Sequence, residues 1–244
     1  MPSFTSQPSS ALAIDQIPAR GSELQALTGL RFFAAAVVVL SHMAYYFPSV
    51  FSAQIFNSLP LAQGVSFFFV LSGFILTYVY PRLNSAGATA QFFRARFARI
   101  YPAYLLALVI CLWAIPLGQF IAHGAPLSGL IVANLLVIHD WIADPQWYCS
   151  INAPSWSVST EVFFYLLFPL LISRFEMNWP WKLLASALLV AICVSICAHL
   201  NQPETALQGF SVRGLIYYNP LCRLFEFVVG MSTAVVWRKA QNAV

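Results

Sequence analysis

Two polar side chains stand inside the first long apolar stretch of the chain, where they could take part in chemistry. Arg31 and His42 fall within residues 27–47, LTGLRFFAAAVVVLSHMAYYF. On an α-helix this spacing is about three turns, so both side chains share one face with roughly 16 Å of rise between them. Ionisable groups are costly in a bilayer and usually mark functional positions, so we expect a catalytic pair in which the imidazole accepts a proton. Helix packing by the histidine and an interfacial arginine are the alternative.

A carboxylate enters a later apolar stretch in the same way. Glu161 lies about one turn inside the segment NAPSWSVSTEVFFYLLFPLLISR, residues 152–174. A buried carboxylate needs a partner or a water-filled cavity. We expect Glu161 to meet His42, hold one imidazole nitrogen and leave the other nitrogen free as a base. An ion pair with Arg223 that only locks two helices is the alternative.

Four arginines precede the third apolar stretch, in residues 82–101, RLNSAGATAQFFRARFARIY. Guanidinium groups match phosphate oxygens well, so Arg94, Arg96 and Arg99 predict a phosphate-binding patch for a phosphorylated cytosolic donor. Anchoring of a cytoplasmic loop by positive charge explains the same cluster without a ligand.

Three further residues complete the predicted site. Arg223 and Glu226 share a helix face, which favours an ion pair, although Arg223 could instead hold an anionic ligand. Ser72 could be a nucleophile, but the sequence places no base next to it. We expect Arg223, Ser72 and Trp156 to contact the substrate. The five cysteines show no metal-binding spacing, so no metal site is expected.

The composition is that of a membrane protein. Hydrophobic residues make up 60% of the 244 and charged residues 8%, against about a quarter charged in soluble domains. A seventh apolar stretch, 126–142, is short and carries Asn134 and His139, which predicts a re-entrant or interfacial helix. We therefore expect an all-α, polytopic transmembrane bundle of about six spans plus this element. The six apolar stretches near the length that a span needs are 27–47, 61–80, 97–118, 157–173, 181–199 and 215–237.

Charge predicts the orientation and the domain limits. With a cytoplasmic amino terminus, most of the twelve lysines and arginines fall in or next to cytoplasmic segments, as the positive-inside rule expects. We expect a polar cytoplasmic tail over 1–26, a transmembrane domain over 27–239 and a short tail over 240–244. The first stretch lacks a clear cleavage site and should act as an uncleaved anchor. The location expected is the cytoplasmic membrane.

Five blocks of the sequence together resemble the membrane-bound acyltransferase 3 family. Arg31 and His42 match the arginine and histidine of its first-helix motif, and Glu161 matches the acidic end of its WSxSxE motif. Arg94, Arg96 and Arg99 match its basic cytoplasmic motif. The blocks, in family order, are LTGLRFFAAAVVVLSH, GVSFFFVLSGFIL, FFRARFARIYPAYLLAL, PSWSVSTEVFFYLLFPLL and NPLCRLFEFVVGM.

The resemblance implies transfer of an acyl group, usually acetyl, from cytosolic acyl-CoA to a hydroxyl of an envelope glycan or lipid-linked sugar. Acyl-CoA would be a co-substrate, not a permanently bound cofactor, and no nucleic-acid partner is expected. His42 would deprotonate the acceptor or carry the acyl group transiently, and the sequence leaves both routes open. Relatives usually have about ten membrane helices, so the chain is expected to be a truncated form. A proton-coupled transporter or flippase, or an inactive truncated member, is the alternative.

Overall fold

The computed structural model describes residues 21–47, 63–116 and 125–243, and this part of the chain contains helices and no strand. The chain forms six long helices and five short ones within these residues. The long helices are α1 (Gly21–Tyr46), α3 (Gln63–Val79), α4 (Ala86–Ala114), α8 (Trp156–Ile172), α9 (Phe175–His199) and α10 (Pro220–Asn242). The short ones are α6 (Leu127–Leu135), η1 (His139–Trp141), α7 (Pro145–Tyr148), η2 (Ala153–Ser155) and η3 (Gly214–Tyr218).

The all-α membrane architecture agrees with the sequence, but the number of long spans is smaller than expected. Within the described residues, four helices are long and apolar enough to cross a membrane. The apolar helices 29–44 and 63–79 are shorter than these. About six full spans are therefore not reached by length. α6 has nine residues and rises only about 14 Å, which is too short to cross the roughly 30 Å hydrocarbon core.

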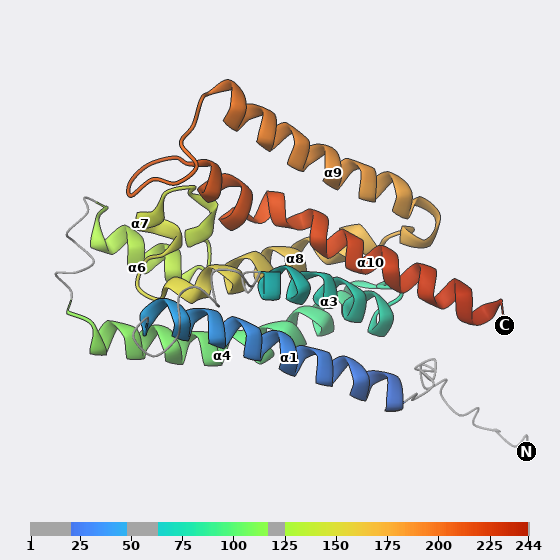
Figure 1. Cartoon of the computed structure of the whole chain (residues 1–244). Coiled ribbons are helices and arrows are strands. Elements are labelled where there is room, and N and C mark those ends of the chain that lie inside the picture. The colour runs from blue at the N-terminus through green and yellow to red at the C-terminus, as the bar shows by residue number, and fades with distance from the viewer. Residues whose placement is uncertain (1–20, 48–62, 117–124, 244) are drawn as a thin grey trace, which may run out of the picture.

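The centre of the bundle is the contact between α3 and α10 (Figure 1). A Cβ atom added to Gly73 of α3 would lie 2.0 Å from the carbonyl oxygen of Phe227. One added to Gly230 of α10 would lie 1.8 Å from the carbonyl oxygen of Val70. The two glycines thus let the backbones touch, as small residues do between membrane helices. Around this contact the buried rings of Phe164, Phe168 and Phe227 form the core.

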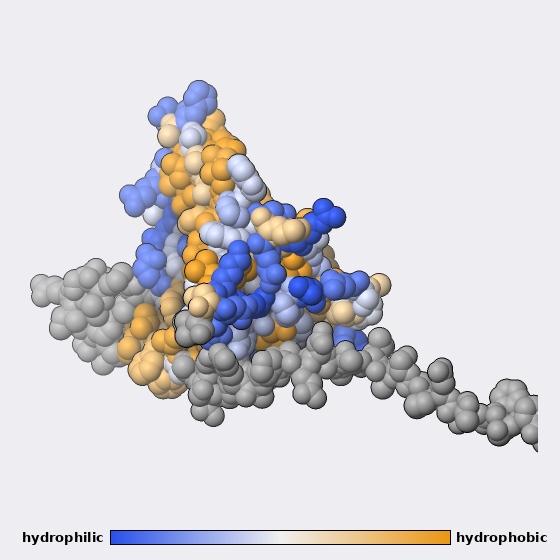
Figure 2. All heavy atoms as spheres, turned by 90° about the vertical axis from the view of Figure 1, so that its right-hand side faces the viewer, coloured by the Kyte–Doolittle hydropathy of each residue, from blue (hydrophilic) through white to orange (hydrophobic). Residues whose placement is uncertain are grey.

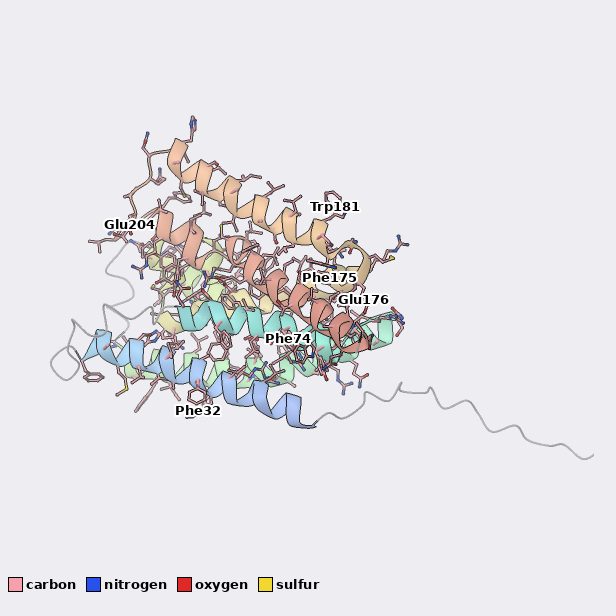
Figure 3. All side chains as sticks on the ribbon, turned by 45° about the vertical axis from the view of Figure 1, so that its right-hand side comes forward. Phe32, Phe74, Phe175, Glu176, Trp181 and Glu204 are labelled. Carbon is pink, nitrogen blue, oxygen red and sulfur yellow. The ribbon has the colours of Figure 1, made fainter. Side chains whose placement is uncertain are left out.

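α9 covers the outside of the bundle and packs mainly against α10 (Figure 1). Trp181 points away from the other helices (Figure 3) and is 72% exposed. Phe32 of α1 is likewise exposed on the outer side of its helix. Large apolar side chains on the outer surface are what a lipid-facing helix requires, because lipid rather than water surrounds it.

Several helix limits differ from the limits of the apolar stretches in the sequence. α1 begins at Gly21, not 27, and residues 1–20 of the predicted tail lie outside the described residues. The Ser85 hydroxyl caps α4 by accepting from the Ala88 amide at 3.1 Å, so the three arginines lie on a helix and not in a loop. The last stretch is divided by Asn219, which caps α10, and α10 runs to Asn242, into the predicted tail.

Basic residues gather at one end of the bundle. Arg238, in the last turns of α10, donates to Glu176 of α9 at 2.8 Å and to the Thr77 carbonyl of α3 at 3.0 Å. Lys182 of α9 donates to the carbonyls at the end of α8, both at 2.7 Å. Figure 2 views the molecule from this end and shows hydrophilic residues gathered on it. The ends of α3, α8 and α10 and the start of α9 therefore lie on one side.

Candidate functional site

A cavity of about 300 Å³ lies among α1, α3, α4 and α8. Four residues singled out from the sequence line it together: Arg31, Ser72, Arg99 and Glu161. The chain positions them from four different helices, so the polar wall exists only in the folded protein. The remaining lining residues are Val38, Val65, Phe68, Phe69, Ile100 and Ser157.

Glu161 is held by two hydroxyl donors. The Ser72 hydroxyl donates to its Oε1 atom at 3.3 Å, and the Tyr165 hydroxyl, one turn further along α8, donates to the same oxygen. Both of these hydrogen bonds, the ones that Glu161 accepts from described residues, go to Oε1 and leave Oε2 without a described donor. Because Glu161 lines the cavity, this oxygen can accept a hydrogen from a bound substrate.

The cavity carries a surplus of positive charge. Arg31 and Arg99 contribute two guanidinium groups against the single carboxylate of Glu161. Such a wall suits a group that is anionic or becomes so during a reaction, for example the carbonyl oxygen of an acyl donor under attack. Arg31, one of the residues singled out from the sequence, thus lines this cavity.

His42 is half-buried on α1, one turn beyond the cavity-lining residue Val38. Its Nδ1 atom lies 2.8 Å from the Val38 carbonyl oxygen. A carbonyl only accepts hydrogen bonds, so Nδ1 carries the hydrogen and Nε2 keeps the lone pair that a general base needs. The backbone of α1 therefore fixes the tautomer of His42.

The expected contact between Glu161 and His42 is absent from the hydrogen bonds of the described residues. Arg31 and Ser72 line the same cavity as Glu161, whereas His42 is not among its lining residues. His42 lies about 16 Å further along α1 than Arg31. The orienting role predicted for Glu161 is therefore filled by the carbonyl of Val38.

The three arginines of α4 do not form one patch. Arg99 lines the cavity, and Arg94 is exposed. Arg96 is half-buried, donates to the Tyr80 hydroxyl at 3.4 Å and lies over the rings of Tyr80, Phe92 and Tyr165. Arg94 is two and five positions from the others and so points in a different direction on the helix, whereas Arg96 and Arg99, three positions apart, share a face and both lie near enough to Arg31 to interact with its charge.

Arg223 is buried away from the described cavity. It forms the predicted ion pair with Glu226 at 3.0 Å and donates to the Ser66 hydroxyl at 2.9 Å. The alternative pair with Glu161 is wrong. Its guanidinium lies over three rings, at 5.3 Å from that of Phe69, 5.0 Å from that of Tyr217 and 6.0 Å from that of Trp156. Neither Arg223 nor Trp156, which is itself buried, is among the residues that line this cavity; both reach it through the ring of Phe69, which does line it.

Sequence reasoning missed a buried polar cluster beside the start of α8. Asp140 is fully buried and bonds the hydroxyls of Ser159 and Thr160. His139, also fully buried, lies 3.2 Å from the Ser155 hydroxyl. The available signal was the run of hydroxyls just before Glu161, because a hydroxyl in an apolar setting needs a partner, which can be a polar group from elsewhere in the chain.

Comparison with known families now adds to this geometry. The model of an acyltransferase domain, that of the acyltransferase 3 family, matches residues 24–243. The chain belongs to this family. The four cavity residues singled out from the sequence fall inside the matched range, as do His42 and Asp140.

Curated relatives include several acyltransferases. The chain is 30% identical to the acyltransferase MdmB of Streptomyces mycarofaciens, over 91% of this chain and 59% of MdmB. It is 26% identical to the putative peptidoglycan O-acetyltransferase YrhL of Bacillus subtilis, over 86% of this chain and 33% of YrhL. It is 28% identical to the peptidoglycan O-acetyltransferase OatA of Listeria monocytogenes, over 71% of this chain and 29% of OatA. The chain thus spans less than two thirds of each of these relatives. No solved structure matches the chain.

Proposed function

We propose that this protein is an integral membrane acyltransferase that moves an acyl group, acetyl in the first instance, from acyl-CoA to a hydroxyl of an envelope glycan or lipid-linked sugar. The observation that carries the proposal is the cavity that joins Arg31, Ser72, Arg99 and Glu161 inside a bundle of the acyltransferase 3 family. Relatives named as peptidoglycan O-acetyltransferases support a glycan acceptor and an acetyl group.

In the proposed reaction, Nε2 of His42 takes the proton of the acceptor hydroxyl. The resulting oxygen attacks the thioester carbon, the carbon–sulfur bond breaks, and the leaving thiolate of CoA recovers the proton from the imidazolium. The same chemistry runs in two steps if Nε2 first accepts the acyl group and then passes it to the hydroxyl. General-base help supplies about 10² to 10⁴ in rate, so positioning of both substrates must supply much of the rest.

The cavity residues take the roles that their placement supports. Arg31 and Arg99 would stabilise the thioester oxygen as it becomes negative, or hold the donor next to His42. Glu161, held at Oε1 by Ser72 and Tyr165, would accept a hydrogen bond from the substrate at Oε2. Exposed Arg94 would contact the phosphates of the donor.

We further propose that the basic end of the bundle faces the cytoplasm, in the cytoplasmic membrane. This assignment is supported by the gathering of Lys182, Arg238 and neighbouring charges at one end, because cytoplasmic segments carry an excess of lysine and arginine. A reporter fused after Lys239 should be cytoplasmic. An extracytoplasmic reporter would contradict the orientation.

The test of function is incubation of membranes that contain the protein with acyl-CoA labelled in its acyl group. Label should reach envelope glycan or lipid-linked sugar, and mass spectrometry should find the added acyl mass only when the protein is present. Uptake of a polar solute without any labelled product would instead support a transporter. Membranes from cells without the protein are the control.

A further inference from the structure

The polar cluster beside α8 is buried on every side. Asp140 and His139 of η1 are each 0% exposed. Both Asp140 oxygens are used: Oδ1 contacts the Ser159 hydroxyl, and Oδ2 accepts from the Thr160 hydroxyl at 2.7 Å. Elements packed on η1 are α6, α7 and α8.

Counting hydrogens favours the protonated form of Asp140. The Ser159 oxygen lies 2.6 Å from the Val137 carbonyl oxygen and also contacts Oδ1 of Asp140. A serine hydroxyl has one hydrogen, and a carbonyl has none to give. If Asp140 were ionised, two acceptors would compete for that hydrogen and one of them would be left buried and unpaired, which is unfavourable. If Oδ1 carries a hydrogen, it donates to Ser159, Ser159 donates to Val137, and every atom is satisfied.

The neighbouring histidine does not supply a compensating charge. Ser155 gives its hydrogen to the Asn152 carbonyl at 2.6 Å, so it accepts from Nε2 of His139 at 3.2 Å. Nδ1 is buried without a partner in the described residues, which is tolerable for a lone pair and costly for an N–H. His139 is therefore neutral, and because Asp140 does not bond Nδ1, these residues do not form a Ser–His–Asp triad.

No cation faces Asp140 from the described elements around it. α6 has no titratable side chain, α7 presents Tyr148, and α8 carries Glu161 and Tyr165. From α4, Tyr104 lies near enough to interact electrostatically with Asp140. In keeping with this setting, burial raises the pKa of Asp140 to about 7 and lowers the pKa of His139 to about 4.

We infer that Asp140 works as a neutral carboxylic acid and positions Glu161 for catalysis. Through Ser159 and Thr160, the two residues just before Glu161, it fastens the first turns of α8 to η1. The level at which Glu161 meets Ser72 and the cavity depends on this attachment. The inference rests on the proposed function, since it assigns Glu161 a contact with substrate. Ionisation of Asp140 draws the Ser159 hydrogen from the Val137 carbonyl to Oδ1, so the Ser159–Val137 bond is lost and the start of α8 shifts relative to Val137.

The decisive variant is Asp140→Asn. Its amide can donate to Ser159 and accept from Thr160, so it reproduces the neutral acid and cannot ionise. We expect the kcat of Asp140→Asn to stay within about threefold of wild type below pH 7. Asp140→Ala should lose about 10²-fold in kcat, because a misplacement of about 1 Å has an effect of that size. Its KM for acyl-CoA should be unchanged. The kcat ratio of wild type to Asp140→Asn should fall about tenfold per pH unit above about 7. Asp144→Asn is the matched control, because Asp144 caps α7 and contacts Gly209 but not α8, and it should leave the pH profile unchanged.

Two results would overturn the inference. One is an Asp140→Asn protein that is folded but as inactive as Asp140→Ala, which would mean that a charge is required. The other is a kcat ratio that does not change with pH. If Asp140→Ala fails to fold, the comparison of wild type with Asp140→Asn across pH still tests the inference.

Infrared difference spectroscopy separates this inference from the proposed function. At about pH 6, below the pKa of Asp140, wild type should show the carbonyl stretching band of a protonated carboxyl that Asp140→Asn lacks. No such difference would overturn the neutral acid whatever the transfer assay shows. A wild type that shows the band but transfers no acyl group would overturn the proposed function, and with it the positioning role, while leaving the protonation state established.

Discussion

At the scale of single residues, the site is defined by which atoms of the polar side chains remain free. Nδ1 of His42 is occupied by the Val38 carbonyl, and Oε1 of Glu161 by Ser72 and Tyr165. Each side chain is thereby held in one orientation, with Nε2 and Oε2 left for a substrate. Local backbone and hydroxyl groups achieve this without a direct contact between the two functional residues.

The arginines of α4 should differ in their effect on the donor. Arg99→Ala should raise the KM for acyl-CoA by about tenfold or more, because it removes a charge from the cavity, while Arg94→Ala should change it less. Arg96→Ala should act mainly on stability, since its guanidinium packs on three rings. Steady-state kinetics and thermal unfolding of the three purified variants check this. Equal KM changes in all three would restore the single patch that the sequence suggested.

Arg223 should prove structural. Arg223→Ala leaves the half-buried Glu226 without its charged partner, and breaking a fully buried pair in this way costs about 3–5 kcal/mol, which is the upper limit here. We expect a marked loss of thermal stability in detergent and an unchanged KM for acyl-CoA in the protein that remains folded. A normal melting temperature together with a raised KM would instead show that Arg223 binds a ligand.

At the scale of elements, the reciprocal glycine contact sets the distance between α3 and α10. Gly73→Ala and Gly230→Ala each place a methyl group within 2.0 Å of a backbone oxygen, so the helices must separate, at a cost of about 1–3 kcal/mol or more. Gly29→Ala is the control, because nothing lies within 4 Å of its added Cβ. Thermal unfolding should show a large loss for the first two and little change for the third. Equal behaviour of all three would contradict the close packing.

The sequence located much of the site, and its failures have physical causes. Arg31 and Glu161 stood out because charge is rare in apolar helices, and they do share a cavity. His42 was the wrong partner for Glu161 because the two residues were placed at equal depth in the membrane from the limits of their apolar stretches. The level at which two helices actually meet depends on side-chain packing. Asp140 was missed because its partners lie 19 and 20 residues further along the chain, a distance that no local pattern reveals.

At the scale of the whole molecule, stability should depend on pH through Asp140. Its pKa in the fold, about 7, lies above the ordinary 3.8, so the folded state binds the proton more tightly than the unfolded state does. The contribution of Asp140 to the free energy of unfolding is therefore fully present below about pH 4 and is lost as the pH rises to about 7. Above that pH it no longer changes, and the total change is on the order of 4 kcal/mol at most. Asp140→Asn should flatten this slope in denaturant unfolding. An unaltered slope would show that other groups cause it.

The bundle as a whole brings a basic cavity, a histidine with a fixed tautomer and an apolar outer surface together in one membrane unit. The central claim is that His42 is the base or acyl carrier of an acyltransferase. Its most direct test is the rate of label transfer from acyl-CoA by His42→Ala, with the exposed His199→Ala as control and both proteins made at wild-type level. We predict a loss of at least about 10²-fold for His42→Ala and full activity for His199→Ala. Full transfer by His42→Ala would contradict the account.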